Sequence, residues 1–300
     1  MHGAPAIINA HAGGGRAAQF EPILEVDGFT LHRARDAAHA EQLAADAAVA
    51  CAPVVACAGG DGTIHHVVTA MRRAVDEGRC DRMPQLILLP AGTGNDTARA
   101  LGLEPTPEGV RALLRSTATR PLDLVRVTSV GEPDRWVVNL ANGGVAGKVA
   151  EAVQDADKSA PGPLAYLKAL AAVATEFPQF DITLTIDGQT HRFPRAGAAM
   201  VANGPFAGGG WALVPDARPD DGLLNVLVVT DATQWDRVRA AARTLVSAHA
   251  DDPIVRTWTG RSVRIDSAPP LPFSTDGEAV GQTPLTFTME PAALRVRVLQ

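Results

Sequence analysis

The stretch Gly59-Gly60-Asp61-Gly62-Thr63 follows the short apolar run 54–58 and precedes a segment with helical periodicity, Ile64 to Val75. This order predicts a strand, a glycine turn and the N-terminus of a helix. We expect the glycines to adopt positive φ and to let a ligand approach the main chain closely. We also expect Thr63 to cap the helix through its hydroxyl. A helix N-terminus presents unpaired N–H groups and the positive end of a dipole, so the turn is suited to phosphate.

Asp61 does not fit a simple phosphate cradle, because a carboxylate repels phosphate. An acid among anion-binding amides indicates either a bridging Mg²⁺ ion or a partner in proton transfer.

A second turn of the same form follows about 30 residues later, which is the spacing of βαβ units. The apolar run Gln85 to Pro90 leads into Ala91-Gly92-Thr93-Gly94-Asn95-Asp96, and a helix-like segment begins at Thr97. An earlier strand candidate, Ala6 to Ile8, ends at Asn9 and a glycine loop, 11–15. In open α/β sheets such turns gather at the carboxyl edge of the strands. The sequence therefore predicts an N-terminal α/β nucleotide-binding domain with a parallel sheet.

Composition excludes several classes of protein. The 300 residues carry a formal net charge of -6, which argues against a general nucleic-acid binder and against a polybasic membrane anchor. Three cysteines without metal-site spacing favour a reduced, cytoplasmic setting. The N-terminal residues lack the charged and apolar regions of a secretory signal, and no run reaches the ~20 apolar residues of a membrane span.

The pattern changes near residue 122 from alternating strands and helices to mostly short strands. We expect a helix from Pro105 to Arg120, broken by Pro121, and then a second, β-rich domain. Its strand candidates are 122–127, 136–142, 180–187, 191–193, 198–202, 222–230, 262–266, 285–289 and 294–299. Two helices, 164–175 and 234–247, interrupt this series. The domain boundary is placed between residues 121 and 122.

Two common nucleotide motifs are absent from the sequence. Gly147-Lys148 lacks the upstream glycine of a Walker A loop, and Gly92-Thr93-Gly94 is followed at the third position by Thr97 instead of glycine. Neither a P-loop NTPase nor a Rossmann dehydrogenase is supported.

The two glycine turns together resemble those of the bacterial diacylglycerol kinase and lipid kinase family, which is related to sphingosine, ceramide and NAD kinases. The later segments that resemble the family are 139–144, Gly208-Gly209-Gly210, Pro215-Asp216, Asp220-Asp221-Gly222-Leu223-Leu224 and Asp276-Gly277-Glu278. These segments occur in the family order over nearly the whole chain.

The resemblance implies an α/β kinase catalytic domain over 1–121 and a β-sandwich lipid-binding domain over 122–285. Residues 286–300 would return to the first domain, and the active site would lie in the interdomain cleft. ATP would contact the residues Asn9, Gly59, Gly60, Asp61, Gly62, Thr63, Ile64, His65, Gly92, Thr93, Gly94 and Asn95.

The resemblance also assigns chemical roles. Glu278 would be the general base that takes the proton from the lipid hydroxyl, and Asp61 would organise Mg²⁺ and the triphosphate. A Mg²⁺ site, structural or catalytic, maps onto the backbone carbonyls of Arg218 and Leu223 and the side chain of Asp221. Phosphoryl transfer depends mainly on positioning and charge neutralisation, which these groups can supply.

The implied protein is an ATP- and Mg²⁺-dependent lipid kinase, a phosphotransferase with an alcohol acceptor that acts in lipid metabolism and phospholipid biosynthesis. Its acceptor would be a diacylglycerol-like or other long-chain lipid, met as a peripheral protein at the inner, cytoplasmic membrane surface. The sequence leaves a homodimer open. An NAD kinase-like enzyme and a catalytically weak nucleotide-binding regulator remain alternatives.

The chain departs from the family pattern at several places in its first domain. His65 and His66 stand where the family commonly has Asn and Glu, and this pair motivates the regulator alternative. Ala10 replaces a proline, Thr97 replaces a phenylalanine, and the family's adenine-side threonine falls on Ala34 or a neighbour. These changes bear on nucleotide preference and rate, and leave the expected fold unchanged.

Overall fold

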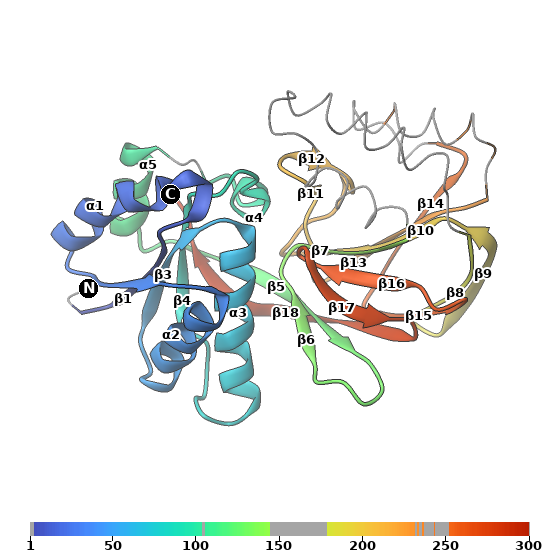
Figure 1. Cartoon of the computed structure of the whole chain (residues 1–300), viewed down its shortest axis with the longest axis horizontal. Coiled ribbons are helices and arrows are strands. Elements are labelled where there is room, and N and C mark those ends of the chain that lie inside the picture. Colours follow the sequence, from blue (N-terminus) through green and yellow to red (C-terminus); the bar gives the residue numbers. More distant parts are fainter. Residues whose placement is uncertain are drawn as a thin grey trace. The chain divides into compact units, whose positions relative to one another are not determined.

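The computed structural model describes residues 3–103, 106–144, 179–231, 233, 236, 243 and 252–299. Backbone contacts divide the chain into two compact units (Figure 1). Unit 1 comprises Met1–Leu124, Pro219–Asp221 and Glu290–Gln300, and unit 2 comprises Val125–Arg218 and Gly222–Met289.

Unit 1 is built on a parallel sheet in the order β2–β1–β3–β4. Its strands are β1 (Pro5–Asn9), β2 (Thr30–Ala34), β3 (Val54–Gly59) and β4 (Gln85–Pro90). Its helices are α1 (Glu21–Val26), α2 (Ala37–Val49), α3 (Asp61–Asp76), α4 (Asp96–Ala100) and α5 (Pro107–Arg115), with 3-10 turns η1 (Ala12–Gly14) and η2 (Arg16–Phe20).

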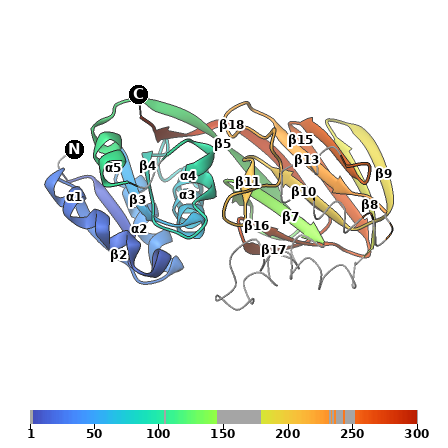
Figure 2. The same ribbon diagram turned by 90° about the horizontal axis from the view of Figure 1, so that it is seen from above.

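The two central strands explain why this sheet is parallel and covered. All six residues of β3 and all but the first of β4 are buried, which matches their continuous apolar sequences. Such strands require cover on both faces, and helices provide it in βαβ units. Helices α2 and α3 lie side by side in both views and pack against this sheet (Figures 1 and 2).

The predicted helix from Pro105 to Arg120 is wrong in extent. Helix α5 ends at Arg115, because Ser116 adopts an extended conformation and its hydroxyl donates to the carbonyl of Val298. The chain is already in strand β5 (Thr119–Thr128) when it reaches Pro121. Tertiary contact with the C-terminal segment therefore ends this helix, and the proline does not.

Unit 2 consists mainly of antiparallel strands. Those after β5 are β6 (Arg135–Val137), β7 (Leu140–Gly144), β8 (Phe180–Ile186), β9 (Gln189–Ala196), β10 (Ala198–Ala202), β11 (Phe206–Ala207), β12 (Trp211–Ala212), β13 (Leu224–Val229), β14 (Val255–Gly260), β15 (Ser262–Ala268), β16 (Pro272–Thr275), β17 (Glu278–Gln282) and β18 (Leu285–Arg297). One sheet runs β14–β13–β10–β7–β16–β17. The strands β18–β15–β8–β9 with β5 and β6 belong to the ten-stranded sheet whose other strands are β2, β1, β3 and β4.

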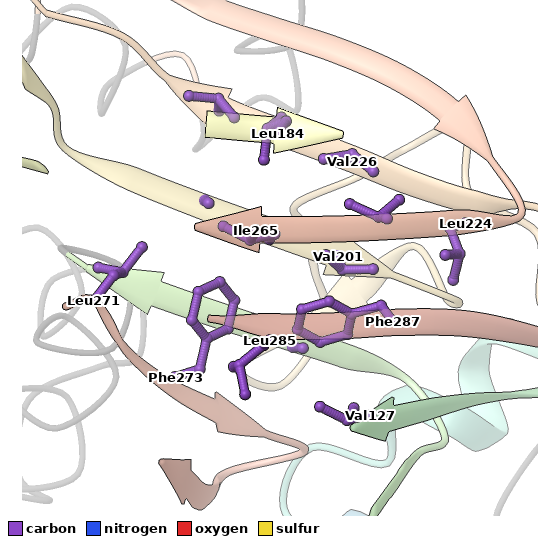
Figure 3. Close-up of a cluster of buried hydrophobic side chains, with 14 of the residues drawn as sticks. Val127, Leu184, Val201, Leu224, Val226, Ile265, Leu271, Phe273, Leu285 and Phe287 are labelled. Atoms are coloured by element: carbon purple, nitrogen blue, oxygen red, sulfur yellow. The ribbon is translucent and has the colours of Figure 1, made fainter. Parts of the chain in front are cut away.

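The core of unit 2 is formed by side chains from both of these sheets (Figure 3). Phe273 of β16 and Phe287 of β18 come from different sheets, and their ring centroids are 5.6 Å apart. Two sheets that share one apolar layer form a sandwich. The prediction of an N-terminal α/β domain with a parallel sheet and a C-terminal β-rich domain is confirmed.

Two strand predictions after residue 122 need correction. The single strand predicted over 136–142 is two strands, β6 and β7. Between these strands the Asp276 carboxylate accepts hydrogen bonds from the backbone N–H groups of Val138 and Asn139, which interrupts the ladder. The strands predicted over 285–289 and 294–299 are one strand, β18, which stays extended except at Ala292 with φ of 50°.

The helices predicted over 164–175 and 234–247 lie outside the described residues. Within the described ranges, no helix combines the length and the apolar character needed to cross a membrane.

Candidate functional site

The two glycine turns of unit 1 contact each other. A Cβ atom on Gly60 would lie 3.0 Å from the Cα of Gly92, and one on Gly59 would lie 2.5 Å from the Cβ of Thr63. The expectation of positive φ is wrong at Gly59, Gly60 and Gly62, none of which has positive φ. Glycine is required at 59 and 60 for close approach by the chain itself.

Helix α3 begins at Asp61, with Gly60 in an extended conformation at its N-cap and no side chain bonded as a cap. The prediction that Thr63 caps this helix is wrong, because Thr63 already lies inside the first turn. Its hydroxyl accepts a hydrogen bond of 2.9 Å from the Asn9 side-chain amide. The end of β1 is thereby tied to α3, and the first-turn amides of α3 receive no side-chain cap from Gly60.

Asp61 joins the first turn to the second. Its two carboxylate oxygens accept from the backbone N–H groups of Asp96 and Thr97, each at 3.0 Å. These amides belong to the start of α4, so Asp61 acts as a cap for that helix from a distant part of the chain. Asn95 holds the same turn from within: its side chain accepts from Gly92 N–H at 2.8 Å and donates to Gly92 C=O at 3.0 Å.

A pocket of about 480 Å³ lies at this carboxyl edge of the unit 1 sheet. Its lining residues are Asn9, His11, Ala12, Gly13, Ala34, Arg35, Asp36, Ala37, Ala40, Gly60, Gly62, Thr63, His66 and Gly92. Five predicted nucleotide contacts are among them: Asn9, Gly60, Gly62, Thr63 and Gly92. The remaining seven, Gly59, Asp61, Ile64, His65, Thr93, Gly94 and Asn95, are not on this wall.

Nucleotide contacts were expected from the sequence in the loop from Asn9 and near Ala34, but Arg35, Asp36 and His11 were not named individually. Arg35 and Asp36 directly follow β2, and the Asp36 carboxylate accepts from His39 N–H to cap α2. The rule that loops after parallel strands meet at one edge could have identified them. His11 lies in the loop after β1, and its backbone N–H donates to the Asn9 side chain at 3.1 Å.

The two histidines of α3 occupy different surroundings. His65 is buried, whereas His66 is one of the residues that line the pocket. Nδ1 of His66 lies 2.8 Å from a carboxylate oxygen of Glu41 on α2, and the two imidazole rings meet edge to face. Glu41 also lies 3.8 Å from the guanidinium of Arg73. His66 is therefore held in place by neighbouring helices.

Glu278 opens strand β17 in unit 2, and its side chain is exposed. It pairs with Thr275 across a turn formed by Asp276 and Gly277, whose φ values are 48° and 94°. The sequence signal Asp-Gly-Glu is thus a hairpin turn with the glutamate on the following strand.

The residues predicted to bind Mg²⁺ lie in the loop that leads into β13. Arg218 and Asp221 are exposed, Leu223 is half-buried, and Gly222 turns the chain with φ of 74°. The neighbouring Asp220 forms an ion pair with Arg120, whose Nε donates a hydrogen bond to its carboxylate at 2.6 Å. Carboxylate and carbonyl oxygens are the ligand types that Mg²⁺ prefers. In the described part of the chain, no three Asp, Glu, His or Cys side chains cluster in a way that could hold a metal ion.

Two family models match the chain. The diacylglycerol kinase catalytic domain matches residues 4–127, and the "YegS C-terminal NAD kinase beta sandwich-like domain" matches residues 139–298.

Similar proteins carry consistent names. A "Probable lipid kinase YegS-like" of Xanthomonas euvesicatoria pv. vesicatoria is 32% identical over 264 residues, which covers 86% of this chain and 83% of that protein. The protein of the same name from Pseudomonas aeruginosa is 31% identical over 264 residues and is covered to 81%. The solved structure described as "a putative diacylglycerol kinase from Bacillus anthracis str. Sterne" matches with a TM-score of 0.80 over 99% of this chain and 95% of that one. At 20% identity, this match supports the fold alone.

Proposed function

Because the chain belongs to the family of YegS-like lipid kinases with a diacylglycerol kinase catalytic domain, we propose that it transfers the γ-phosphoryl group of ATP to a lipid hydroxyl. The acceptor is a diacylglycerol-like or other long-chain lipid. The protein meets it as a peripheral protein at the inner, cytoplasmic membrane surface.

The observation that carries the proposal is the pocket in unit 1. Gly60, Gly62 and Gly92 contribute main chain without side chains to its wall, and the N-terminus of α3 begins there. Backbone amides at a helix N-terminus bind phosphate oxygens well, and glycines allow these oxygens to approach closely. A pocket of this size, about 480 Å³, falls in the range of small-molecule sites. These features fit the phosphate end of a nucleotide.

In our proposal, Asp61 supports this site by holding the two glycine turns together. Its carboxylate connects the two turns by binding the amides of Asp96 and Thr97. Removal of this bridge would displace Gly92 relative to Gly60, and with it the phosphate-binding main chain. A direct contact between Asp61 and metal remains a prediction from the family resemblance.

The loop carrying Asp221 fits a hard cation, since it offers an exposed carboxylate and the carbonyls of Arg218 and Leu223. A Mg²⁺ ion bound there would neutralise phosphate charge or stabilise the loop. We assign Glu278 as the general base. Its exposed carboxylate on β17 can accept the proton of an incoming hydroxyl, which raises the nucleophilicity of the lipid oxygen.

The test is phosphorylation of defined lipids by the purified full chain. The protein is incubated with γ-labelled ATP, Mg²⁺ and detergent micelles that contain dioleoylglycerol, monooleoylglycerol, ceramide or phosphatidylglycerol, and NAD is added in a parallel reaction. We expect a labelled lipid product. Glu278→Gln should reduce its formation by at least ~100-fold while ATP binding is retained. Glu132→Gln, which changes an exposed glutamate elsewhere in unit 2, should leave the rate unchanged.

Other outcomes would identify the rival functions. Labelled NADP without labelled lipid would indicate an NAD kinase. Binding of ATP without ADP formation on any acceptor would indicate the regulator that the His65-His66 pair suggests. Full activity of Glu278→Gln would remove the base assignment.

A further inference from the structure

Four hydrogen bonds join Asp276 to a distant segment of unit 2, three through its carboxylate and one through its backbone N–H. One carboxylate oxygen accepts from Val138 N–H at 2.7 Å, and the other accepts from the N–H groups of Asn139 and Leu140, each at 3.0 Å. The backbone N–H of Asp276 itself donates to the carbonyl of Leu140 at 2.9 Å. One residue at a hairpin turn thus binds three consecutive amides of a distant segment.

These hydrogen bonds take the place of ladder hydrogen bonds where the pairing of β16 with β7 ends. Strand β16 pairs with β7 up to the partners Thr275 and Ala141. Beyond that point the chain bends between β6 and β7, and the carboxylate satisfies the amides that the bend removes from a ladder. Hydrogen bonds from amides to a carboxylate are roughly twice as strong as neutral ones, so the turn is fixed to residues 138–140.

Residues 138–140 are themselves held by a neighbouring loop. The carbonyl of Asn139 accepts from the N–H groups of Asn203 and Gly204, and the side-chain amide of Asn139 donates to the carbonyl of Phe206 at 2.6 Å. The segment whose amides bind the Asp276 carboxylate is therefore itself held in place by hydrogen bonds.

Glu278 stands two residues after Asp276, at the start of β17. Farther along the hairpin, the buried Phe273 and Val280 belong to the core of unit 2. The hairpin is held to the core by these two side chains and at its tip by Asp276. Glu278 lies between these points. Its backbone is therefore restrained on both sides, while its side chain is exposed.

The geometry points to Asp276 as a positioning residue that fixes the Glu278 carboxylate for proton transfer by binding the amides of residues 138–140. This inference rests on the proposed function, in which Glu278 is the general base. Aspartate is specifically suited to the task. Asparagine offers one acceptor oxygen and an NH₂ group that faces an N–H donor, and alanine offers none.

Unit 2 supplies a matched control at its other Asp-Gly hairpin turn. Asp187 and Gly188 have φ values of 45° and 85°, close to those of Asp276 and Gly277. The Asp187 carboxylate also binds backbone amides, those of Arg261 at 3.1 Å and Ser262 at 2.9 Å. No residue assigned to catalysis follows this second turn. Asp187→Asn therefore reproduces the structural cost of losing a carboxylate clamp.

The experiment compares Asp276→Asn, Asp187→Asn, Glu278→Gln and the double variant Asp276→Asn/Glu278→Gln in the lipid phosphorylation assay, with the dioleoylglycerol, monooleoylglycerol, ceramide and phosphatidylglycerol micelles as acceptors. We expect Asp276→Asn to lower kcat by ~10- to 100-fold, because small misplacement of a catalytic group costs this much. The KM for ATP should stay within about twofold, since the ATP pocket lies in unit 1. Asp187→Asn should keep kcat within about twofold. The double variant should be no slower than Glu278→Gln, because both changes disable one function.

Hydrogen exchange provides a readout that does not depend on the lipid. The amides of residues 138–140 should exchange faster in Asp276→Asn, and those of residues 261 and 262 should do so in Asp187→Asn.

The positioning role is overturned if Glu278→Gln abolishes turnover while Asp276→Asn keeps the wild-type kcat. It is also overturned if the two losses multiply in the double variant, if Asp187→Asn slows turnover equally, or if the amides of residues 138–140 keep their protection in Asp276→Asn. If the wild type phosphorylates none of the lipids, or if Glu278→Gln is fully active, the proposed function fails first and the positioning role fails with it.

Discussion

The main chains of Gly60 and Gly92 lie in contact, so that a Cβ atom on Gly92 would stand 2.5 Å from the Cα atom of Gly60. The two residues belong to turns that follow the neighbouring parallel strands β3 and β4. Each turn therefore packs against the other, and both line the pocket of unit 1.

Gly92→Ala should destabilise unit 1 by about 1–3 kcal/mol, the usual cost of forcing extra volume into a packed site. The added methyl group must push the Gly60 main chain away, because backbone atoms cannot rotate aside as a side chain can. The same shift should weaken ATP binding. Urea unfolding and calorimetric titration with ATP measure the two effects.

Gly62→Ala serves as the control for the Gly92 prediction. A Cβ atom at Gly62 meets no atom within 4 Å, and Gly62 lies inside helix α3. Alanine in a helix is more favourable than glycine by about 0.5–1 kcal/mol, so this variant should be at least as stable as the wild type. Equal stability of Gly92→Ala and Gly62→Ala would contradict the close contact.

Asp61→Ala should lower the free energy of unfolding by about 1–3 kcal/mol in buffer without nucleotide or Mg²⁺. The change leaves the N–H groups of Asp96 and Thr97 without their carboxylate, and hydrogen bonds to charged groups contribute this much. Thr106→Ala removes an ordinary helix cap on α5 and should cost about 0.5–2 kcal/mol without affecting ATP affinity. If Asp61→Ala unfolds like the wild type in the absence of metal, its carboxylate has a ligand-binding role only.

The strands of unit 1 could be predicted from sequence because their signal is local. The run 54–58 is apolar at every position, which only a strand covered on both faces can bury. The meeting of the two glycine turns also follows from sequence, since loops after parallel strands share one edge. The reason for the glycines did not follow, because contact between Gly60 and Gly92 depends on the register of β3 and β4.

Hydrogen bonds between distant residues account for most of the remaining differences. Ser116 ends α5 by bonding to the carbonyl of Val298, which no local pattern around Pro121 could reveal. Asp61 was expected to organise Mg²⁺ and the triphosphate, and Asp276 was noted only as part of the Asp-Gly-Glu segment. Their carboxylates nevertheless bind backbone amides that are 35 and 138 residues away. A carboxylate has the same sequence signature whether it binds a metal ion or a main-chain N–H.

His66→Ala should weaken ATP binding by roughly three- to tenfold while leaving the free energy of unfolding within about 1 kcal/mol of the wild type. His66 lines the pocket, and Glu41 of α2 holds its imidazole through Nδ1. Calorimetric titration with ATP measures the change. His32→Ala, on β2 and away from the pocket lining, is the control and should bind ATP normally. An unchanged affinity in His66→Ala would show that the histidine does not contact the nucleotide.

The free energy of unfolding should fall at alkaline pH because of Cys57. Complete burial in β3 raises the pKa of its thiol from 9.0 to about 12. The folded state therefore keeps the proton where the unfolded state loses it. The stabilising effect is fully present below pH 9.0 and disappears as pH rises toward about 12. Between about pH 8 and about pH 10.5 the wild type should lose about 2 kcal/mol more than Cys57→Ala, at about 1.4 kcal/mol per pH unit above the unfolded pKa.

Urea unfolding at several pH values measures this difference, with Cys51 and Cys80 retained in both proteins so that their titration cancels. A thiol reagent provides an independent check in the native protein near neutral pH. Exposed Cys51 should react within minutes, and Cys57 should react only after unfolding, because the thiolate is the reactive form and burial suppresses it. Parallel pH profiles for the wild type and Cys57→Ala, or rapid native labelling of Cys57, would contradict a buried, protonated thiol in the strand that precedes the first glycine turn.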